Sequence, residues 1–222
     1  MSVNRKSEIR SQKSDNPQSQ NPQSVVLNPQ SSPAIFIDRD GTINEDLGYI
    51  SRPDDLLIYP GVAEAVRLVN KAGLKTIVVT NQSGVARGFY SEDDLREIHN
   101  RMISELQKED ARIDAVYYCP HHPDYGDELY RKDCECRKPR PGMLYAAARE
   151  HNIDLARSFV IGDKASDINL AANAGARGAL VLTGYGKETL AHQVRWPCEP
   201  DFVADSLLRA VEAILDERRP RR

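Results

Sequence analysis

Two acidic residues, Asp38 and Asp40, follow directly on the apolar run 34–37 and are themselves followed by Gly-Thr. An aspartate carboxylate can attack a phosphate monoester and carry the phosphoryl group as an aspartyl-phosphate. An acid two residues further on could protonate the departing oxygen and then deprotonate the attacking water. The pattern therefore indicates a nucleophile with a proton-transfer partner, although Asp40 could instead only cap the turn.

Other groups that phosphoryl transfer can use lie just after later apolar runs or beside a Pro-rich segment: Thr80, Asn81, Lys138, Asp163, Lys164 and Asp167. Carboxylates at close range repel each other unless a cation lies among them. Mg²⁺ fits that place because it prefers oxygen ligands and can bridge protein oxygens and a phosphate. The acids therefore predict a magnesium site.

A second cluster lies in the segment 119–136 and consists of two close pairs of metal-binding residues: Cys119, His121, Cys134 and Cys136. Three thiolates and one imidazole suit a tetrahedral Zn²⁺ site that is structural, because four protein ligands leave no open position. His122 is the alternative to His121, and reduced cysteines without metal are the alternative to zinc. Cys198 lies far from the cluster in the sequence and has no assigned role.

Strand and helix patterns alternate from residue 33 onward. Strands are predicted at 34–37, 74–79, 113–118, 159–161, 179–182 and 202–204, and helices at 61–72, 91–109, 142–151, 168–174 and 206–215. This order favours a mostly parallel sheet with helices on both faces. Ligands of such sheets bind beyond the carboxyl ends of the strands. Asp38, Thr80 and Asp163 each follow a predicted strand, so they can converge there.

Three segments differ in composition. Residues 1–32 are rich in Ser, Gln, Asn and Pro and have few large apolar side chains, so we expect a disordered tail, with a docking peptide as the alternative. Residues 33–217 form one catalytic domain, and 218–222 are a basic end. No insertion is large enough for a separate cap domain, so the loops at about 44–60, 82–90 and 119–138 must shape the pocket.

The chain has 222 residues, a formal net charge of −3 and 40% hydrophobic residues, which allow one domain with a sizeable core. The acidic balance argues against nucleic acid as a partner. No run approaches a membrane span, and no apolar core of a signal peptide is present. We therefore expect a cytoplasmic, monomeric protein that acts on a small molecule.

Four motifs follow one another along the chain: Asp38 with Asp40, Thr80-Asn81, Lys138, and Asp163-Lys164 with Asp167. In this order they resemble the haloacid dehalogenase (HAD) superfamily of phosphotransferases, over about residues 33–205. The resemblance implies a three-layer Rossmann-like HAD domain. It makes Asp38 the nucleophile and a magnesium ligand, Asp40 the acid–base residue and a ligand through its backbone carbonyl, and Asp163 a second carboxylate ligand. Asp167 would orient Lys164 or a metal-bound water.

The same resemblance assigns the remaining polar groups. Thr80 would hydrogen-bond a phosphoryl oxygen, and Lys138 would screen the nucleophile and stabilise charge on the equatorial oxygens. The substrate-binding candidates are Asn81 near the transferring phosphate, Arg137 on a distal phosphate or sugar hydroxyls, Arg87 and Lys164. Arginine suits a phosphate because its fork binds two oxygens at once.

Within the superfamily, the cysteine loop with TNQSGVARG and CRKPRPGM is similar to the D-glycero-D-manno-heptose 1,7-bisphosphate 7-phosphatases. Twelve residues separate His121 from Cys134, as in those enzymes, whereas the related histidinol-phosphate phosphatases have a shorter insert. The resemblance implies Mg²⁺-dependent hydrolysis of the C7 phosphate of a phosphorylated sugar. The alternatives are a histidinol-phosphate phosphatase or another small phosphomonoesterase, a polynucleotide 3′-phosphatase, and a non-catalytic scaffold.

Overall fold

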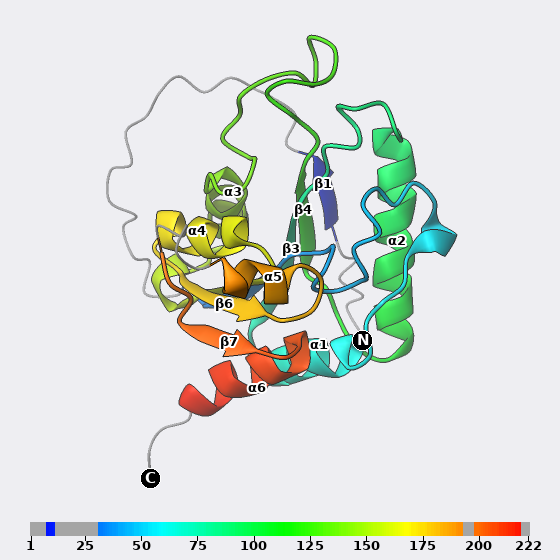
Figure 1. Ribbon diagram of the computed structural model, residues 1–222. Coiled ribbons are helices and arrows are strands. Elements are labelled where there is room, and N and C mark those ends of the chain that lie inside the picture. Colours follow the sequence, from blue (N-terminus) through cyan, green and yellow to red (C-terminus); the bar gives the residue numbers. More distant parts are fainter. Residues whose placement is uncertain (1–7, 12–30, 193–197, 219–222) are drawn as a thin grey trace.

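The computed structural model describes residues 8–11, 31–192 and 198–218, and these form a parallel sheet between two layers of helices (Figure 1). The strand order is β1-β4-β3-β2-β5-β6-β7, and every neighbouring pair is parallel. The strands are β1 Glu8–Ser11, β2 Ala34–Ile37, β3 Lys75–Asn81, β4 Ala115–Cys119, β5 Phe159–Gly162, β6 Arg177–Val181 and β7 Phe202–Ala204. The predicted α/β class is confirmed.

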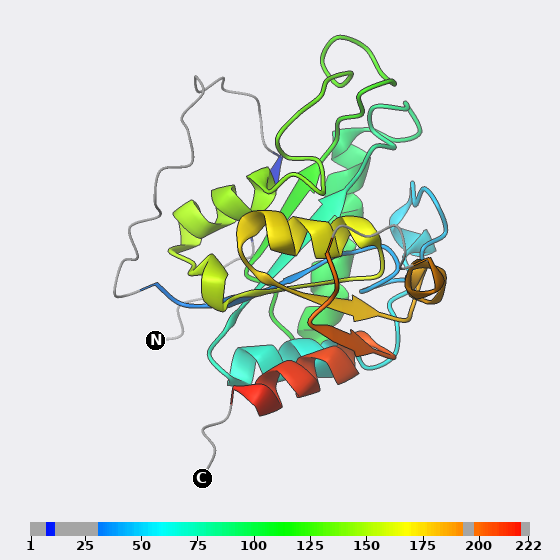
Figure 2. The ribbon, with the colours of Figure 1, turned by 60° about the vertical axis from the view of Figure 1, so that its left-hand side comes forward.

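The helices cover both faces of the sheet (Figures 1 and 2). They are α1 Val62–Lys71, α2 Glu92–Lys108, α3 Gly142–His151, α4 Ala165–Ala174, α5 Gly186–Ala191 and α6 Leu207–Glu217, with short 3₁₀ turns at Pro53–Asp55 and Leu155–Arg157. Successive β2 side chains face opposite ways. Ile35 and Ile37 pack with α1, α2 and α6, whereas Ala34 and Phe36 pack with α3 and α4. Both faces of β2 are therefore buried, which explains its continuous apolar sequence.

The chain reverses its direction of travel across the sheet at β2. It runs from β2 through β3 to β4 on one side, and then continues with β5, β6 and β7 on the other. A crevice opens at the carboxyl ends of the strands where such a reversal occurs. Asp38 follows β2 and Asp163 follows β5, the two strands that flank this switch point. The topology thus places both acids at the natural ligand position.

Two elements differ from the sequence expectation. Helix α5 has six residues, which is too short to show a helical apolar period. Glu8–Ser11 form β1 beside β4, within the segment for which a disordered tail is expected. Most of residues 1–32 lie outside the described residues, so that expectation stays a prediction. The capping box of Ser91 and Asp94 is confirmed at the start of α2.

No helix in the described ranges is both long and apolar enough to cross a bilayer.

Candidate active site

Three buried carboxylates meet at the carboxyl end of the sheet. Asp38 follows β2, Asp163 follows β5 and Asp167 lies in the first turn of α4, and each offers an oxygen within 4.8 Å of the others. Asp163 and Asp167 are fully buried and Asp38 is 4% exposed. Carboxylates so close together and so dry require positive charge nearby. Part of it comes from a buried lysine.

Lys138 is that lysine, and its ammonium group joins two of the acids. Its Nζ lies 2.8 Å from Asp38 Oδ1 and 2.7 Å from Asp167 Oδ1, and donates to the Val79 carbonyl at 3.2 Å. Three oxygens, two of them from carboxylates, therefore surround the ammonium group. Asp38 Oδ1 also accepts from the Arg39 N–H at 2.7 Å. Both contacts fall on Oδ1, which leaves Oδ2 as the oxygen available for attack.

The carboxylate cluster fits a divalent cation. Burial raises the pKa of Asp38 from 3.8 to about 6 even with Lys138 alongside. Burial and the charge of Asp38 raise the pKa of Asp163 to about 7. Asp163 Oδ1 is buried and has no hydrogen-bond partner within the described ranges, whereas Oδ2 accepts from the Tyr185 N–H at 2.8 Å. An unpartnered carboxylate oxygen beside a second acid is a suitable ligand for Mg²⁺.

Glycine is required where the chain passes closest to Asp163. Gly41 has φ +86°, and a Cβ there would lie 2.1 Å from Asp163 Oδ2. A Cβ on Gly184, which has φ +52°, would lie 2.3 Å from the same oxygen. Any side chain at either position would displace the carboxylate. Gly41 is therefore needed for two reasons: its backbone is left-handed, and it lies too close to Asp163 for any side chain.

Asp40 is held by a dense set of donors. Its carboxylate accepts two hydrogen bonds from Arg39 Nη2, at 2.8 and 2.9 Å, and a third from Arg39 Nε at 3.0 Å. Asn44 Nδ2 adds a bond at 3.0 Å and Gln82 Nε2 one at 2.7 Å. Burial alone would raise the pKa of Asp40, but Arg39, Asn44 and Gln82 together lower it. The Asp40 carboxylate is therefore ionised and fixed in place before any substrate binds.

Asn81, at the end of β3, contacts the backbone of Lys138. Its Nδ2 donates to the Lys138 carbonyl at 3.2 Å, and its Oδ1 accepts from the Lys138 N–H at 3.0 Å. These two bonds fix the backbone of Lys138 to the end of β3. The substrate-binding role of Asn81 is untested and stays a prediction. The contact that the structure shows is one that positions Lys138.

Asp167 contacts both Lys164 and Lys138, and its expected role in orienting Lys164 or a metal-bound water stays a prediction. Its Oδ2 accepts from the Lys164 backbone N–H at 3.1 Å, while its Oδ1 pairs with the Lys138 ammonium. The Lys164 ammonium instead pairs with Asp46 Oδ2 at 2.7 Å and lies 4.9 Å from the centre of the Tyr185 ring. Asp167 thus orients Lys138, and Lys164 reaches the loop 44–60.

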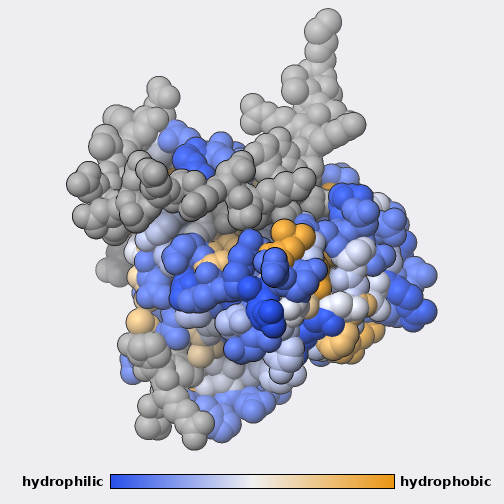
Figure 3. Space-filling model, turned by 90° about the horizontal axis from the view of Figure 1, so that it is seen from above, coloured by the Kyte–Doolittle hydropathy of each residue, from blue (hydrophilic) through white to orange (hydrophobic). Residues whose placement is uncertain are grey.

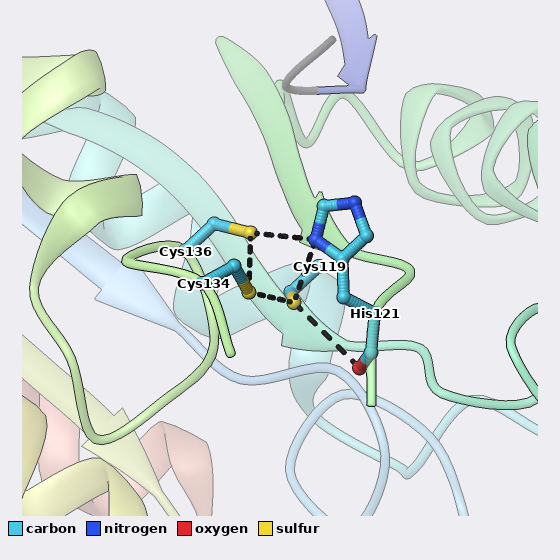
Figure 4. A group of neighbouring side chains, drawn as sticks. All are labelled: Cys119, His121, Cys134 and Cys136. Atoms are coloured by element: carbon cyan, nitrogen blue, oxygen red, sulfur yellow. Dashed lines mark hydrogen bonds between the residues drawn. The ribbon is translucent and has the colours of Figure 1, made fainter. Parts of the chain in front are cut away.

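The cysteine cluster has the shape of a tetrahedral site. The four side chains point toward one another from the end of β4 and from the loop before α3 (Figure 4). Cys134 Sγ lies 3.5 Å from Cys119 Sγ and 3.2 Å from Cys136 Sγ, and His121 Nδ1 lies 3.3 Å from Cys136 Sγ. A tetrahedral Zn²⁺ with Zn–S bonds of about 2.3 Å would set its sulfur ligands roughly 3.8 Å apart.

The chemistry of the cluster also fits a cation. Contact among the thiols raises the pKa values of Cys119 and Cys136 and lowers the pKa of Cys134, so a cation that binds all three would displace protons from Cys119 and Cys136. His122 has other partners: its Nε2 lies 3.4 Å from Arg87 Nη2, and its ring contacts Tyr125. Of the two histidines, the structure therefore groups His121 with the cysteines.

The cluster is directly continuous with the carboxylate site. Arg137 and Lys138 immediately follow Cys136, and Arg137 Nη1 donates to the His121 carbonyl at 3.2 Å. Arg140 Nη1 donates to the Cys134 carbonyl at 3.1 Å. Loosening the cysteine cluster would therefore loosen the segment that carries Lys138.

Arg87 lies beside a cleft of about 600 Å³ between the loop after β3 and the cysteine loop. Its guanidinium stacks on Tyr125, 3.6 Å from the ring centre, and lies 5.9 Å from that of Tyr49. Seen from above, on the side where the loop after β4 projects, the surface is mainly hydrophilic with small apolar patches (Figure 3). Exposed apolar side chains near this cleft include Phe89 after β3, Tyr125 after β4 and Tyr49 on the loop after β2.

Sequence reasoning missed several buried residues around Asp40, among them Arg39 and Gln82. Arg39 is 1% exposed and Gln82 is 2% exposed, and both contact Asp40. The only signal was their position: Arg39 lies between Asp38 and Asp40, and Gln82 lies two residues after Thr80. Long polar side chains usually lie at the surface, so nothing in their type indicates burial.

Magnesium should stabilise the protein more at high pH than at low pH. A raised carboxyl pKa means that the metal-free fold favours protonated Asp38 and Asp163. That contribution is complete below about pH 4 and is lost as the pH rises through about 6 to 7. The Tm increase caused by Mg²⁺ should therefore be larger at about pH 8 than at about pH 5, by thermal denaturation. Asp163→Asn should remove most of it, and an equal increase at both pH values would contradict the site.

Cys134→Ser should lower stability and activity together, because the segment carrying Lys138 would loosen. Elemental analysis of the unmodified protein should find roughly one zinc per chain. Cys198→Ser serves as the matched control and should retain zinc, Tm and activity. Zinc-stripped protein with unchanged Tm and phosphatase rate would rule out the structural role.

The comparisons with known proteins agree with this geometry. The family described as HAD-hydrolase-like matches residues 135–210. The D-glycero-D-manno-heptose-1,7-bisphosphate 7-phosphatase of Thermosynechococcus vestitus is 46% identical over 193 residues, which are 85% of this chain and 98% of that protein. The D-glycero-beta-D-manno-heptose-1,7-bisphosphate 7-phosphatase of Escherichia coli K12 is 42% identical over 192 residues, 86% of this chain and 97% of that one.

A solved structure is similar over most of the fold. The D,D-heptose 1,7-bisphosphate phosphatase of B. bronchiseptica, complexed with magnesium and phosphate, matches with a TM-score of 0.75 and 37% identity. The match covers 83% of this chain and 99% of that chain. Similarity of this extent relates the whole catalytic domain to those proteins, and not only its short motifs.

Proposed function

We propose, from the premise that this chain belongs to the family of D-glycero-D-manno-heptose-1,7-bisphosphate 7-phosphatases, that it hydrolyses the C7 phosphate of heptose 1,7-bisphosphate and leaves heptose 1-phosphate. The chain is a HAD-type phosphoric monoester hydrolase. The observation that carries the substrate proposal is identity of 42 to 46% over nearly the full length of relatives with this activity in their names.

The side chains support a two-step displacement. Asp38 Oδ2, the oxygen not engaged by Lys138, attacks the phosphorus, and the bond from phosphorus to the C7 oxygen breaks. A proton on Asp40 would pass to that departing oxygen. Asp40 then takes a proton from water as the water oxygen attacks the aspartyl-phosphate, which releases phosphate and restores Asp38. Lys138 balances the charge of Asp38 throughout both steps.

Metal ions complete the proposal. When bound, Mg²⁺ would neutralise charge on the phosphoryl group; its ligands would be Asp38, Asp163 and the Asp40 carbonyl. Zn²⁺ would be structural and held by the cluster of Cys119, His121, Cys134 and Cys136. A monomeric state and a cytoplasmic location stay predictions, which size-exclusion chromatography and cell fractionation would check.

The remote phosphate supplies the means of selecting the substrate. Without a cap domain, selection falls to the loops and to cations such as Arg137 and Arg87. Arg137 is partly exposed and lies one residue from Lys138. Binding energy from the C1 phosphate at Arg137 could position the C7 ester at Asp38.

The test is regiochemistry with a remote-contact variant. Phosphorus NMR of the product from heptose 1,7-bisphosphate should show that the C1 phosphate remains. Arg137→Ala should lower kcat/KM far more for the bisphosphate than for p-nitrophenyl phosphate, which has no remote phosphate. Arg149→Ala, on helix α3, is the matched control and should leave both values unchanged. A C7-phosphate product, or equal rates on histidinol phosphate, would reject the heptose assignment while leaving the phosphatase class intact.

A further inference from the structure

Gln82 is a buried polar side chain to which the mechanism above gives no part. It follows β3 directly, two residues after Thr80, and is 2% exposed. Its backbone N–H donates to the Cys119 carbonyl at 2.8 Å, and its carbonyl accepts from the Val85 N–H at 3.3 Å. The residue is thus fixed at the end of the sheet, with its side-chain amide between Arg39 and the reaction site.

The orientation of this amide follows from its partners. Gln82 Oε1 accepts from Arg39 Nη2 at 3.1 Å and from the Tyr90 hydroxyl at 2.6 Å. A guanidinium can only donate hydrogen bonds, so the amide atom that faces Arg39 must be the oxygen. Arg39 is itself oriented by His99, whose Nε2 lies 3.2 Å from Arg39 Nη1. The amide nitrogen must therefore face the other way.

On that other side lie Thr80, the proposed donor to a phosphoryl oxygen, and Asp40, the proposed acid–base residue. Gln82 Nε2 donates to Asp40 Oδ2 at 2.7 Å and to Thr80 Oγ1 at 2.8 Å. This is the only hydrogen bond of the Thr80 hydroxyl within residues 8–11, 31–192 and 198–218. Because the hydroxyl accepts from Gln82, its own proton is free for another acceptor.

We propose that Gln82 is a positioning residue that fixes the direction of the Thr80 hydroxyl, so that its proton is offered to the phosphoryl group. The inference rests on the phosphatase mechanism proposed above. A hydroxyl without this neighbour could turn its proton toward the protein and present a lone pair to a phosphoryl oxygen. Arg39 thus fixes which end of the Gln82 amide carries the oxygen, and the nitrogen at the other end donates to the Thr80 hydroxyl.

Two substitutions of the same size separate positioning from structural support. Gln82→Glu keeps acceptors for Arg39 and Tyr90 but places an acceptor against Thr80, which draws the hydroxyl proton away from the substrate. Gln82→Met removes every polar contact and leaves the hydroxyl free to rotate. A merely structural role predicts that Gln82→Glu is the milder change, because it satisfies the buried Arg39, whose charge also offsets the repulsion between the new carboxylate and Asp40.

The positioning role predicts the opposite order for turnover. With Mg²⁺ and p-nitrophenyl phosphate, kcat should fall about 100-fold in Gln82→Glu, as for the loss of one donor to a transition state, and about 10-fold in Gln82→Met. KM should change less than about threefold in both. The Tm values should follow the reverse order, with Gln82→Glu nearer the unmodified protein.

A double-mutant cycle with Thr80 identifies the path of the effect. In the Thr80→Val background, which has no hydroxyl, Gln82→Glu and Gln82→Met should have equal kcat. In the Thr80→Ser background, which keeps the hydroxyl, the difference of about 10-fold between them should remain. Using a simple ester keeps this test independent of the heptose assignment.

Three results would overturn the inference. The first is a kcat for Gln82→Glu at or above that of Gln82→Met. The second is a difference between them that persists without the Thr80 hydroxyl, which would place the effect on Asp40. The third is an unchanged kcat in Thr80→Val alone, which would remove the proposed role of Thr80 itself and with it the need to position its hydroxyl.

Discussion

Asp38→Asn should abolish release of phosphate from every ester while the protein stays folded. The substitution removes the attacking carboxylate and a predicted Mg²⁺ ligand at once. An amide at this position can still accept from the Arg39 N–H and from Lys138, which now hold Asp38 Oδ1 at 2.7 and 2.8 Å. The substitution therefore keeps the contacts that hold this side chain, and we expect the site to stay folded. We expect kcat to fall by at least about 10⁴-fold, measured by phosphate release with Mg²⁺.

The control for Asp38→Asn is a neutral substitution at a similar carboxylate. Asp114 also lies at one end of the sheet, where it accepts from the Thr76 N–H at 2.9 Å. Asp114→Asn should leave turnover unchanged. Mass spectrometry of acid-quenched enzyme should detect a phosphorylated chain with Asp38 present and none with Asp38→Asn. Turnover close to that of the unmodified protein in Asp38→Asn would refute its assignment as nucleophile.

Asp40→Asn should slow turnover by roughly 10² to 10⁴-fold, the usual share of general acid–base catalysis. The size should depend on the leaving group. A sugar alkoxide needs a proton in order to leave, whereas p-nitrophenolate leaves without one. Formation of the aspartyl-phosphate should therefore be slowed much more for the sugar ester, while its hydrolysis should be slowed equally for both. Rapid-quench measurement of the phosphorylated enzyme separates the two steps.

The protonation state of Asp40 predicts the direction in which pH should change the rate of aspartyl-phosphate formation. Its pKa is lowered in the free protein, chiefly by Arg39 acting against the effect of burial. At neutral pH the carboxylate is therefore ready as a base but seldom holds the proton it needs as an acid. With the sugar ester, the rate of aspartyl-phosphate formation should fall as the pH rises above the Asp40 pKa, and Asp40→Asn should lose this dependence. If Asp40 only caps the turn, Asp40→Asn would match the unmodified protein in both steps.

The positions of the acids could be predicted from the sequence because strand ends are local features. Asp38 and Asp163 each follow a short apolar run, and parallel strands bring their carboxyl ends to one edge. The cluster of three cysteines and His121 could also be predicted from a local feature, because its ligands occur as two close pairs in the sequence. Helix α3 was predicted with its observed bounds, from Gly142 to His151.

What only the tertiary structure decided is which polar groups contact one another across the crevice. The contacts of Asn81 with the Lys138 backbone and of Asp167 with the Lys138 ammonium join residues on different strands and loops. They depend on β2 lying between β3 and β5 and on the rotamers that packing allows. The sequence alone contains the types and spacing of the reacting groups. It does not show that Gln82 is buried, because burial of a polar side chain depends on partners that only folding brings to it.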